Sequence, residues 1–214
     1  MLHILITYWP ALLSGLAVTL GIAGCAVCCG IVLGIPLGWF AKENPNTSLV
    51  SILDIGKWFL SSVPALMFIL WFYYPLQAIL NMDIGPFWSA AIALAFVNIL
   101  MVGQIVYAAR CNLPAGLYET MRLHPCNAWH RLTKVEGPYI LKHALSAFIN
   151  SQISILHATL LASFIGAEDL LKIGSQINSA VYRPIEIYTI LALIFAVICL
   201  PLTYIAQRYH ESRS

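Results

Sequence analysis

The sequence contains very little charge. Lys, Arg, Asp and Glu make up 9% of its 214 residues, and 60% are hydrophobic, whereas a soluble domain carries about 25% charged residues. The apolar residues form runs longer than the ~20 residues that a transmembrane helix needs. This composition excludes an ordinary soluble domain and predicts an all-α integral membrane protein.

Several sequence motifs are missing as well. The chain has no G-x-x-x-x-G-K-[ST] loop, so it cannot cradle a nucleotide in that way. If the chain performs energised transport, the energy source must be another subunit or an ion gradient. We expect the chain itself to be no enzyme and to hold no cofactor. No basic patch is dense enough for nucleic acid to be an expected partner. The N-terminus lacks the basic segment of a cleavable signal peptide, and we expect none.

The six cysteines suggest no chemistry of their own. Cys25, Cys28 and Cys29 have a spacing that can indicate a metal or redox site. They lie inside an apolar run with no His, Asp or Glu nearby, where cysteine packs as a small apolar side chain. We expect neither a metal site nor a disulfide.

The apolar runs predict five transmembrane helices in one domain over residues 1–214. Their approximate ranges are 11–40, 52–80, 87–110, 139–165 and 185–206. In the first, Gly30, Gly34 and Gly38 recur every four residues, which lets another helix approach that face closely. We expect a kink at Pro36, and bends or a break at Pro64 and Pro75.

The basic residues predict the orientation in the membrane. One side would carry nine of them, namely Lys42, Lys57, Arg110, Arg122, Arg131, Lys134, Lys142, Arg208 and Arg213. The other side would carry Lys172 and Arg183. We therefore expect the polar loop 113–138 and the C-terminus in the cytoplasm, and the N-terminus outside.

A few polar side chains fall inside the predicted spans. The candidates for a solute pathway are Asn98, Gln104, His157 and Thr159. His157 stands out because an ionisable group within the membrane is a functional hypothesis by default. Hydrogen bonds between helices are the alternative for the amides and hydroxyls. No formal charge lies well inside a span, which argues against a dedicated proton relay.

The polar loop contains Gly116, then Glu119 three residues on, and Pro138 near its end. In these residues it resembles the cytoplasmic signature of ABC importer permeases, G-Q-x-E-A-A with a second Gly and a closing L-P. Gly116, Glu119 and Pro138 stand at the family's spacing. The departures are Leu117 for the Gln, Thr120-Met121 for the two alanines, Pro125 for the second Gly and Gly137 for the Leu.

The resemblance extends over almost the whole chain. Gln104 and Tyr107 take the places of the Glu and Arg in the family's A-E-x-x-R element, and residues 157–161 resemble its K-D-T-S-L stretch. Residues 177–186, INSAVYRPIE, resemble the polar amino acid branch. This resemblance implies a multi-pass permease of the bacterial inner membrane that moves a polar amino acid or similar small solute by alternating access.

The same resemblance implies partners. They are ATPase subunits that bind ATP and Mg, a second permease copy or a sister permease, and an extracytoplasmic solute-binding protein. It also implies a short cytoplasmic coupling helix, between the third and fourth spans, that contacts the ATPase. Its contact residues would be Gly116, Leu117, Glu119, Met121, Arg122 and Pro138.

Three alternatives stay open from the sequence. One is a methionine-type permease of the same importer class. Another is an ion-coupled carrier that works without an ATPase. The third is a structural subunit that only stabilises a sister permease, which the irregular loop signature allows.

Overall fold

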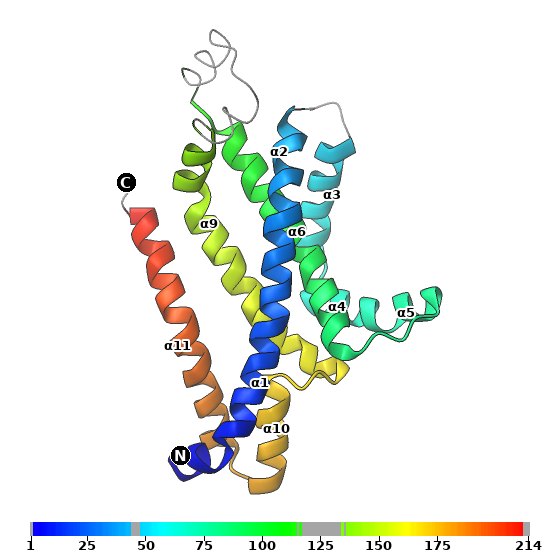
Figure 1. Cartoon of the computed structure of the whole chain (residues 1–214), viewed down its shortest axis with the longest axis vertical. Helices are drawn as coiled ribbons and strands as arrows, with labels where there is room; N and C mark the ends of the chain where they lie inside the picture. Colours follow the sequence, from blue (N-terminus) through cyan, green and yellow to red (C-terminus); the bar gives the residue numbers. More distant parts are fainter. Residues whose placement is uncertain (1, 44–47, 115, 117–133, 135, 212–214) are drawn as a thin grey trace.

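The chain is a bundle of long helices in a computed structural model that describes residues 2–43, 48–114, 116, 134 and 136–211 (Figure 1). Within these residues there is no β-strand. Among the described residues, four helical segments are long and apolar enough to cross a membrane, and one bent helix pair makes a fifth candidate. This agrees with the predicted all-α membrane protein.

The first span is one long helical segment. It consists of α1 (Leu2–Cys29), a π-helical stretch η1 (Gly30–Gly34) and α2 (Ile35–Glu43). The helix therefore begins nine residues before the predicted start at residue 11. Pro36 has no N–H and its ring crowds the carbonyl four residues earlier, so a wider π turn directly before it relieves the clash where we expected a kink.

The second span is broken. Helix α3 (Ser48–Ser62) ends just before Pro64, which has an extended backbone, and the following helices turn away from it by 102°. Helix α4 (Ala65–Tyr73) leads into the short α5 (Pro75–Leu80), which projects from the bundle in Figure 1. The helix is interrupted before both Pro64 and Pro75, which confirms the expected breaks. The physical reason is that neither proline has the N–H that a continuous helix needs.

Helix α6 (Pro86–Cys111) forms the centre of the bundle. In its most apolar stretch 67% of the residues are buried, against 22% to 39% in the other three unbroken spans. Alanines at positions 90, 91, 93 and 95 keep its surface narrow. Neighbouring helices α1, α2, α4 and α9 can therefore pack closely around it.

The last part of the chain contains one more helix than we predicted. Helix α9 (Gly137–Ala158) continues as a 3₁₀ segment η3 (Thr159–Ile165), and α11 (Pro184–Glu211) forms the last span. Between them, in the interval that separates the predicted spans 139–165 and 185–206, lies α10 (Leu170–Val181). Its buried Leu170, Ile173 and Ile177 pack against α1 and α11.

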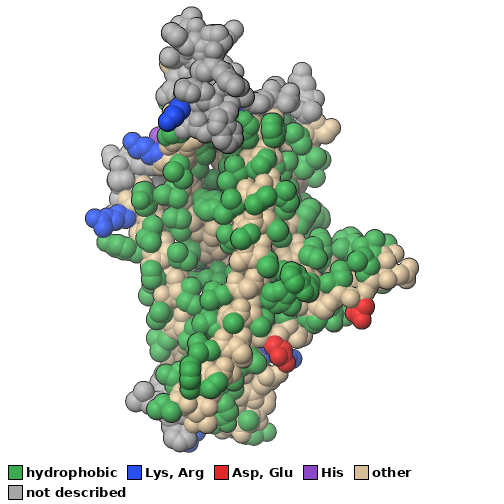
Figure 2. Space-filling model, in the orientation of Figure 1, with side chains coloured by type: hydrophobic (Ala, Val, Ile, Leu, Met, Phe, Trp, Pro, Cys, Tyr) green, Lys and Arg blue, Asp and Glu red, His purple; other side chains and the backbone are tan. Residues whose placement is uncertain are grey.

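The two ends of the bundle differ in charge. We call the end with the C-termini of α2, α6 and α11 and the N-termini of α3 and α9 the loop end, and the opposite end the α10 end. On the face shown in Figure 2, most Lys and Arg side chains lie toward the loop end, and hydrophobic side chains cover the helices between the ends. An apolar band between polar ends is what a bilayer requires.

Candidate functional site: a groove between α3, α6 and α9

A cavity of about 770 Å³ opens at the loop end between α3, α6 and α9. Its wall is largely apolar, with Leu53 on α3 and Ala108 on α6 as examples. The polar groups in it come from all three helices, and they are Asp54, Lys57, Gln104, Tyr107, Asn112, Tyr139 and His143. A mostly apolar pocket with a few convergent polar groups is typical of a small-molecule site.

A second cavity of about 320 Å³ lies deeper in the bundle. It is lined by Ser61 after the middle of α3, by Phe68 of α4 and by Ser154 of α9. Lys57, Met101 and Gln104 line both cavities, so the two adjoin. Together they form one groove that runs from the loop end toward the middle of the span, and we call it the α3–α6–α9 groove.

Gln104 is the predicted pathway residue that lies in this groove. Its side-chain amide donates a hydrogen bond to the Leu53 carbonyl of α3 at 3.2 Å. The side chain is half-buried. It therefore joins two walls of the groove and still faces the space between them.

Asn98 and Thr159 are instead fully buried between helices. The Asn98 amide donates to the Ala26 carbonyl and to the Gln152 side chain, both at 2.9 Å, and Gln152 donates back at 3.3 Å. The Thr159 hydroxyl donates to the Leu156 carbonyl at 2.7 Å. These contacts give both residues a role in joining or capping helices.

His157 lies on an exposed face of α9, three residues beyond Ser154 of the groove. Residues three apart share a helix face, so His157 continues the line of the groove toward the α10 end. Its Nε2 lies 3.4 Å from the Cys199 thiol of α11. Within the described residues, no three His, Cys, Asp or Glu side chains are grouped to hold a metal.

Most of the predicted coupling residues cannot be placed. Leu117, Glu119, Met121 and Arg122 lie outside the described residues. Gly116 is exposed. Pro138 occupies the first turn of α9, a position that suits proline because the first helical N–H groups have no partner within the helix.

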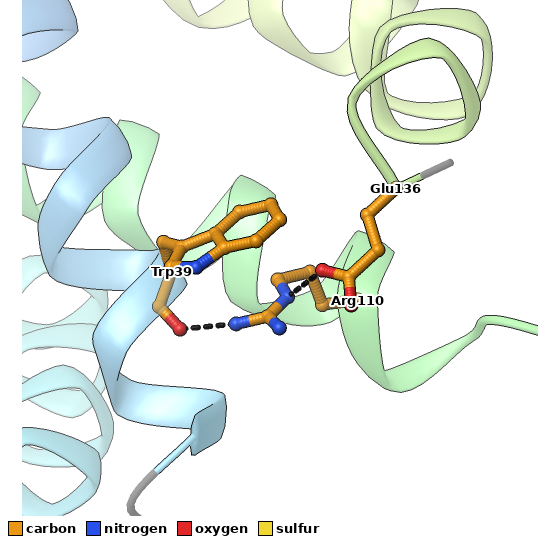
Figure 3. Close-up of polar contacts among 3 residues, drawn as sticks. All are labelled: Trp39, Arg110 and Glu136. Atoms are coloured by element: carbon orange, nitrogen blue, oxygen red, sulfur yellow. Dashed lines mark hydrogen bonds and ion pairs between the residues drawn. The ribbon is translucent and has the colours of Figure 1, made fainter. Parts of the chain in front are cut away.

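A buried ion pair at the loop end was missed by the sequence analysis (Figure 3). Arg110 Nε donates to Glu136 Oε2 at 2.7 Å, and the two side chains are only 4% and 3% exposed. The same guanidinium donates to the Trp39 carbonyl of α2 and stacks on the Trp39 ring, 3.8 Å from its centroid. We call Arg110, Glu136 and Trp39 the Arg110 anchor.

The anchor joins three elements at the point where the polar loop leaves and returns. Arg110 is in the last turn of α6, Glu136 directly precedes α9, and Trp39 is on α2. Arg110 could be counted as a basic residue from sequence, but its partner is 26 residues away. No helical or strand periodicity relates residues at that distance, so only the structure reveals the pair.

Comparison with known proteins decides the family. Residues 34–214 match the model of the binding-protein-dependent transport system inner membrane component. The chain belongs to this family. It is therefore a multi-pass inner-membrane permease of an ABC importer, a class that works with separate ATPase subunits, and the predicted resemblance is confirmed.

Three curated relatives span nearly the whole of this permease. The arginine transport system permease protein ArtQ of Bacillus subtilis is 26% identical over 198 residues, 92% of this chain and 90% of the relative. The histidine/lysine/arginine/ornithine permease protein HisM of Salmonella typhimurium is 26% identical, covering 97% and 95%. The glutamine permease protein GlnP of Escherichia coli is 24% identical, covering 94% and 93%.

Solved structures share the fold. A crystal structure of an amino acid ABC transporter with histidines matches with a TM-score of 0.81 and 25% identity, covering 97% of this permease and 96% of that chain. An inward-facing structure of the MetNI methionine ABC transporter matches with a TM-score of 0.75 and 20% identity, covering 97% and 98%.

Proposed function

We propose that this permease moves a polar amino acid or a similar small solute through the α3–α6–α9 groove. The observation that carries the proposal is the match to amino acid permeases over more than nine-tenths of the chain. Two of these relatives are permeases for basic amino acids and one is a permease for glutamine. The groove supplies a route of suitable chemistry, because it is apolar with a few polar groups at fixed places.

The polar groups of the groove suit a zwitterion. Lys57 and Asp54 are three residues apart on α3 and both line the cavity at the loop end. One offers a positive charge to a carboxylate, and the other a negative charge to an ammonium group. Gln104 and Tyr107 add neutral hydrogen-bonding groups. His157 remains a pathway candidate further along the same face of α9.

The loop end is the cytoplasmic end in this proposal. Six of the described Lys and Arg residues belong to it, namely Lys42, Lys57, Arg110, Lys134, Lys142 and Arg208. Lys172 and Arg183 belong to the α10 end. This asymmetry supports a cytoplasmic C-terminus and an external N-terminus by the positive-inside rule.

The partners follow from this orientation. A coupling helix between the third and fourth spans, carrying Gly116, Leu117, Glu119, Met121 and Arg122, would dock on a cytoplasmic ATPase that binds ATP and Mg. A second permease copy or a sister permease would complete the pathway. An external solute-binding protein would dock near Asp83 and residues 168–186. ATP binding would favour one of two states of the assembly and so drive alternating access.

Copurification followed by transport in proteoliposomes tests the proposal. The permease is expressed with its partners, and the ATPase that copurifies is identified. Uptake of labelled arginine, histidine and glutamine is then measured with ATP, without ATP and with an imposed proton gradient alone. We expect uptake of at least one of them only with ATP. Uptake driven by the gradient alone, or failure to copurify any ATPase, would contradict the proposal.

Two variants test the assigned residues. Lys57→Gln should raise the KM for uptake about tenfold, the effect of losing roughly 1.4 kcal/mol of solute binding, and leave basal ATP hydrolysis unchanged. Lys142→Gln is the matched control, because Lys142 is also exposed near the loop end but does not line the groove. Glu119→Lys should lower ATP-driven uptake; unchanged uptake would instead favour a purely structural subunit.

A further inference from the structure

The Arg110 anchor is built to stay closed. Both members of the ion pair are almost completely buried. Pulling them apart would leave two desolvated charges without their partner, which is strongly unfavourable. The guanidinium is held from a second side by the Trp39 carbonyl and ring. Its planar shape suits this simultaneous pairing and stacking, which an ammonium group could not reproduce.

The anchor connects α9 to a helix pair that is itself tightly packed. A Cβ added at Gly38 of α2 would lie 2.2 Å from the Gly103 carbonyl oxygen of α6, and one at Gly34 would lie 2.7 Å from the Ile99 oxygen. The backbones of η1 and α2 are therefore in direct contact with that of α6, and neither position has room for a side chain larger than glycine. Through Glu136, the first turn of α9 is fixed to this pair.

A second contact supports the same junction. The Tyr139 hydroxyl, in the first turn of α9, donates to the carbonyl of Asn112, the residue that follows α6, at 2.9 Å. Tyr139 also stacks on His143, with ring centroids 3.9 Å apart, and both side chains line the groove. The α9 wall of the groove thus begins within a few residues of the anchor.

We propose that Arg110 and Glu136 are positioning residues that hold the loop ends of α2, α6 and α9 together as one body. The α6 and α9 walls of the groove then move together, with no change in their relative position at the loop end, as the groove opens and closes. This inference rests on the proposed solute route. It gives the ion pair a second role besides stabilising the fold: the pair transmits movement of the loop end to the walls of the groove.

Removing both charges separates coupling from folding. The double variant Arg110→Met/Glu136→Leu removes both charges of the pair together, so neither is left buried without the other, and it should fold and assemble. In the reconstituted importer we expect ATP hydrolysis to continue and the solute moved per ATP hydrolysed to fall roughly 2- to 30-fold, the range for residues that carry coupling. Arg208→Met, which removes an exposed Arg from the same end, should leave the ratio unchanged. An unchanged ratio in the double variant would overturn the proposal.

A covalent replacement of the pair tests whether it stays closed. Arg110→Cys/Glu136→Cys, in a background without the native cysteines, is bridged with a short reducible bis-methanethiosulfonate. We expect the bridged importer to move more solute per ATP than the same protein after reduction. If the bridge stops transport, the pair must open in each cycle and the proposal is wrong. A wild-type complex that fails to transport with ATP would instead contradict the proposed function.

Discussion

Asp169 shows how one residue makes the stability of this permease depend on pH. It is fully buried and caps α10, where its carboxylate accepts a hydrogen bond from the Lys172 backbone N–H at 2.8 Å. The backbone N–H of Leu170, the residue directly after Asp169, donates to the Thr19 hydroxyl of α1 at 3.0 Å. Burial raises the pKa of Asp169 from 3.8 to about 6, and the cap hydrogen bond only partly offsets this effect.

The raised pKa predicts the direction of the pH dependence. Between pH 3.8 and about 6 the folded protein keeps the Asp169 proton that the unfolded chain has lost, so the free energy of unfolding falls as pH rises through this window. The total loss is at most about 3 kcal/mol. We expect the difference in Tm between wild type and Asp169→Asn to change from pH 4 to 6 and to stay constant above, as measured by thermal unfolding in nanodiscs.

The control for this prediction is Asp83→Asn. Asp83 is an exposed carboxyl in the turn after α5, and its replacement should leave the shape of the Tm profile against pH unchanged. A wild-type profile that runs parallel to that of Asp169→Asn over the whole range would show that the buried carboxyl titrates at its ordinary pKa.

At the scale of elements, the contact between α2 and α6 depends on glycine. Gly38→Ala would push a methyl group to 2.2 Å from a backbone oxygen that cannot move aside. Overpacking of this kind costs about 1–3 kcal/mol. Gly24→Ala is the matched control, because a Cβ there would meet no atom within 4 Å among the described residues. Tm in nanodiscs should fall for Gly38→Ala and not for Gly24→Ala; equal values would disprove close packing at Gly38.

Local sequence signals predicted the elements that depend on local chemistry. The break before Pro64 and the distortion before Pro36 follow from a missing N–H and a crowded ring. The glycine face on the first span follows from a four-residue period. Helix α10 was missed because its few buried apolar residues are outnumbered by polar ones, so the interval reads as a loop unless its helical period is counted.

The candidate site was less predictable, because its residues come together only in the folded bundle. Gln104 was identified as a polar residue in a span, but Asp54, Lys57 and His143 join it from two other helices. Asn98 was identified in the same way, as a polar residue in a span. Its role is structural because its amide donates hydrogen bonds to Ala26 and Gln152 of other helices. Sequence polarity alone cannot separate a groove-lining amide from one between helices.

At the scale of the whole molecule, the orientation remains the prediction on which the coupling argument depends. The described basic residues divide as six at the loop end and two at the α10 end. Moving such a cluster across a membrane opposes the bias that sets topology. If the loop end is cytoplasmic, solute released from the wide cavity of the groove enters the cell, and the Arg110 anchor lies on the side where ATP is hydrolysed.

Single cysteines at the two ends test this orientation. Lys134→Cys and Lys172→Cys are made in a background without native cysteines, since both lysines lie outside the spans, at the loop end and the α10 end respectively. Spheroplasts are treated with a membrane-impermeant maleimide before and after permeabilisation. We expect position 172 to react in intact spheroplasts and position 134 only after permeabilisation, because the reagent cannot cross the apolar core of the bilayer. The opposite pattern would reverse the direction of transport through the groove, and with it the placement of the ATPase at the loop end.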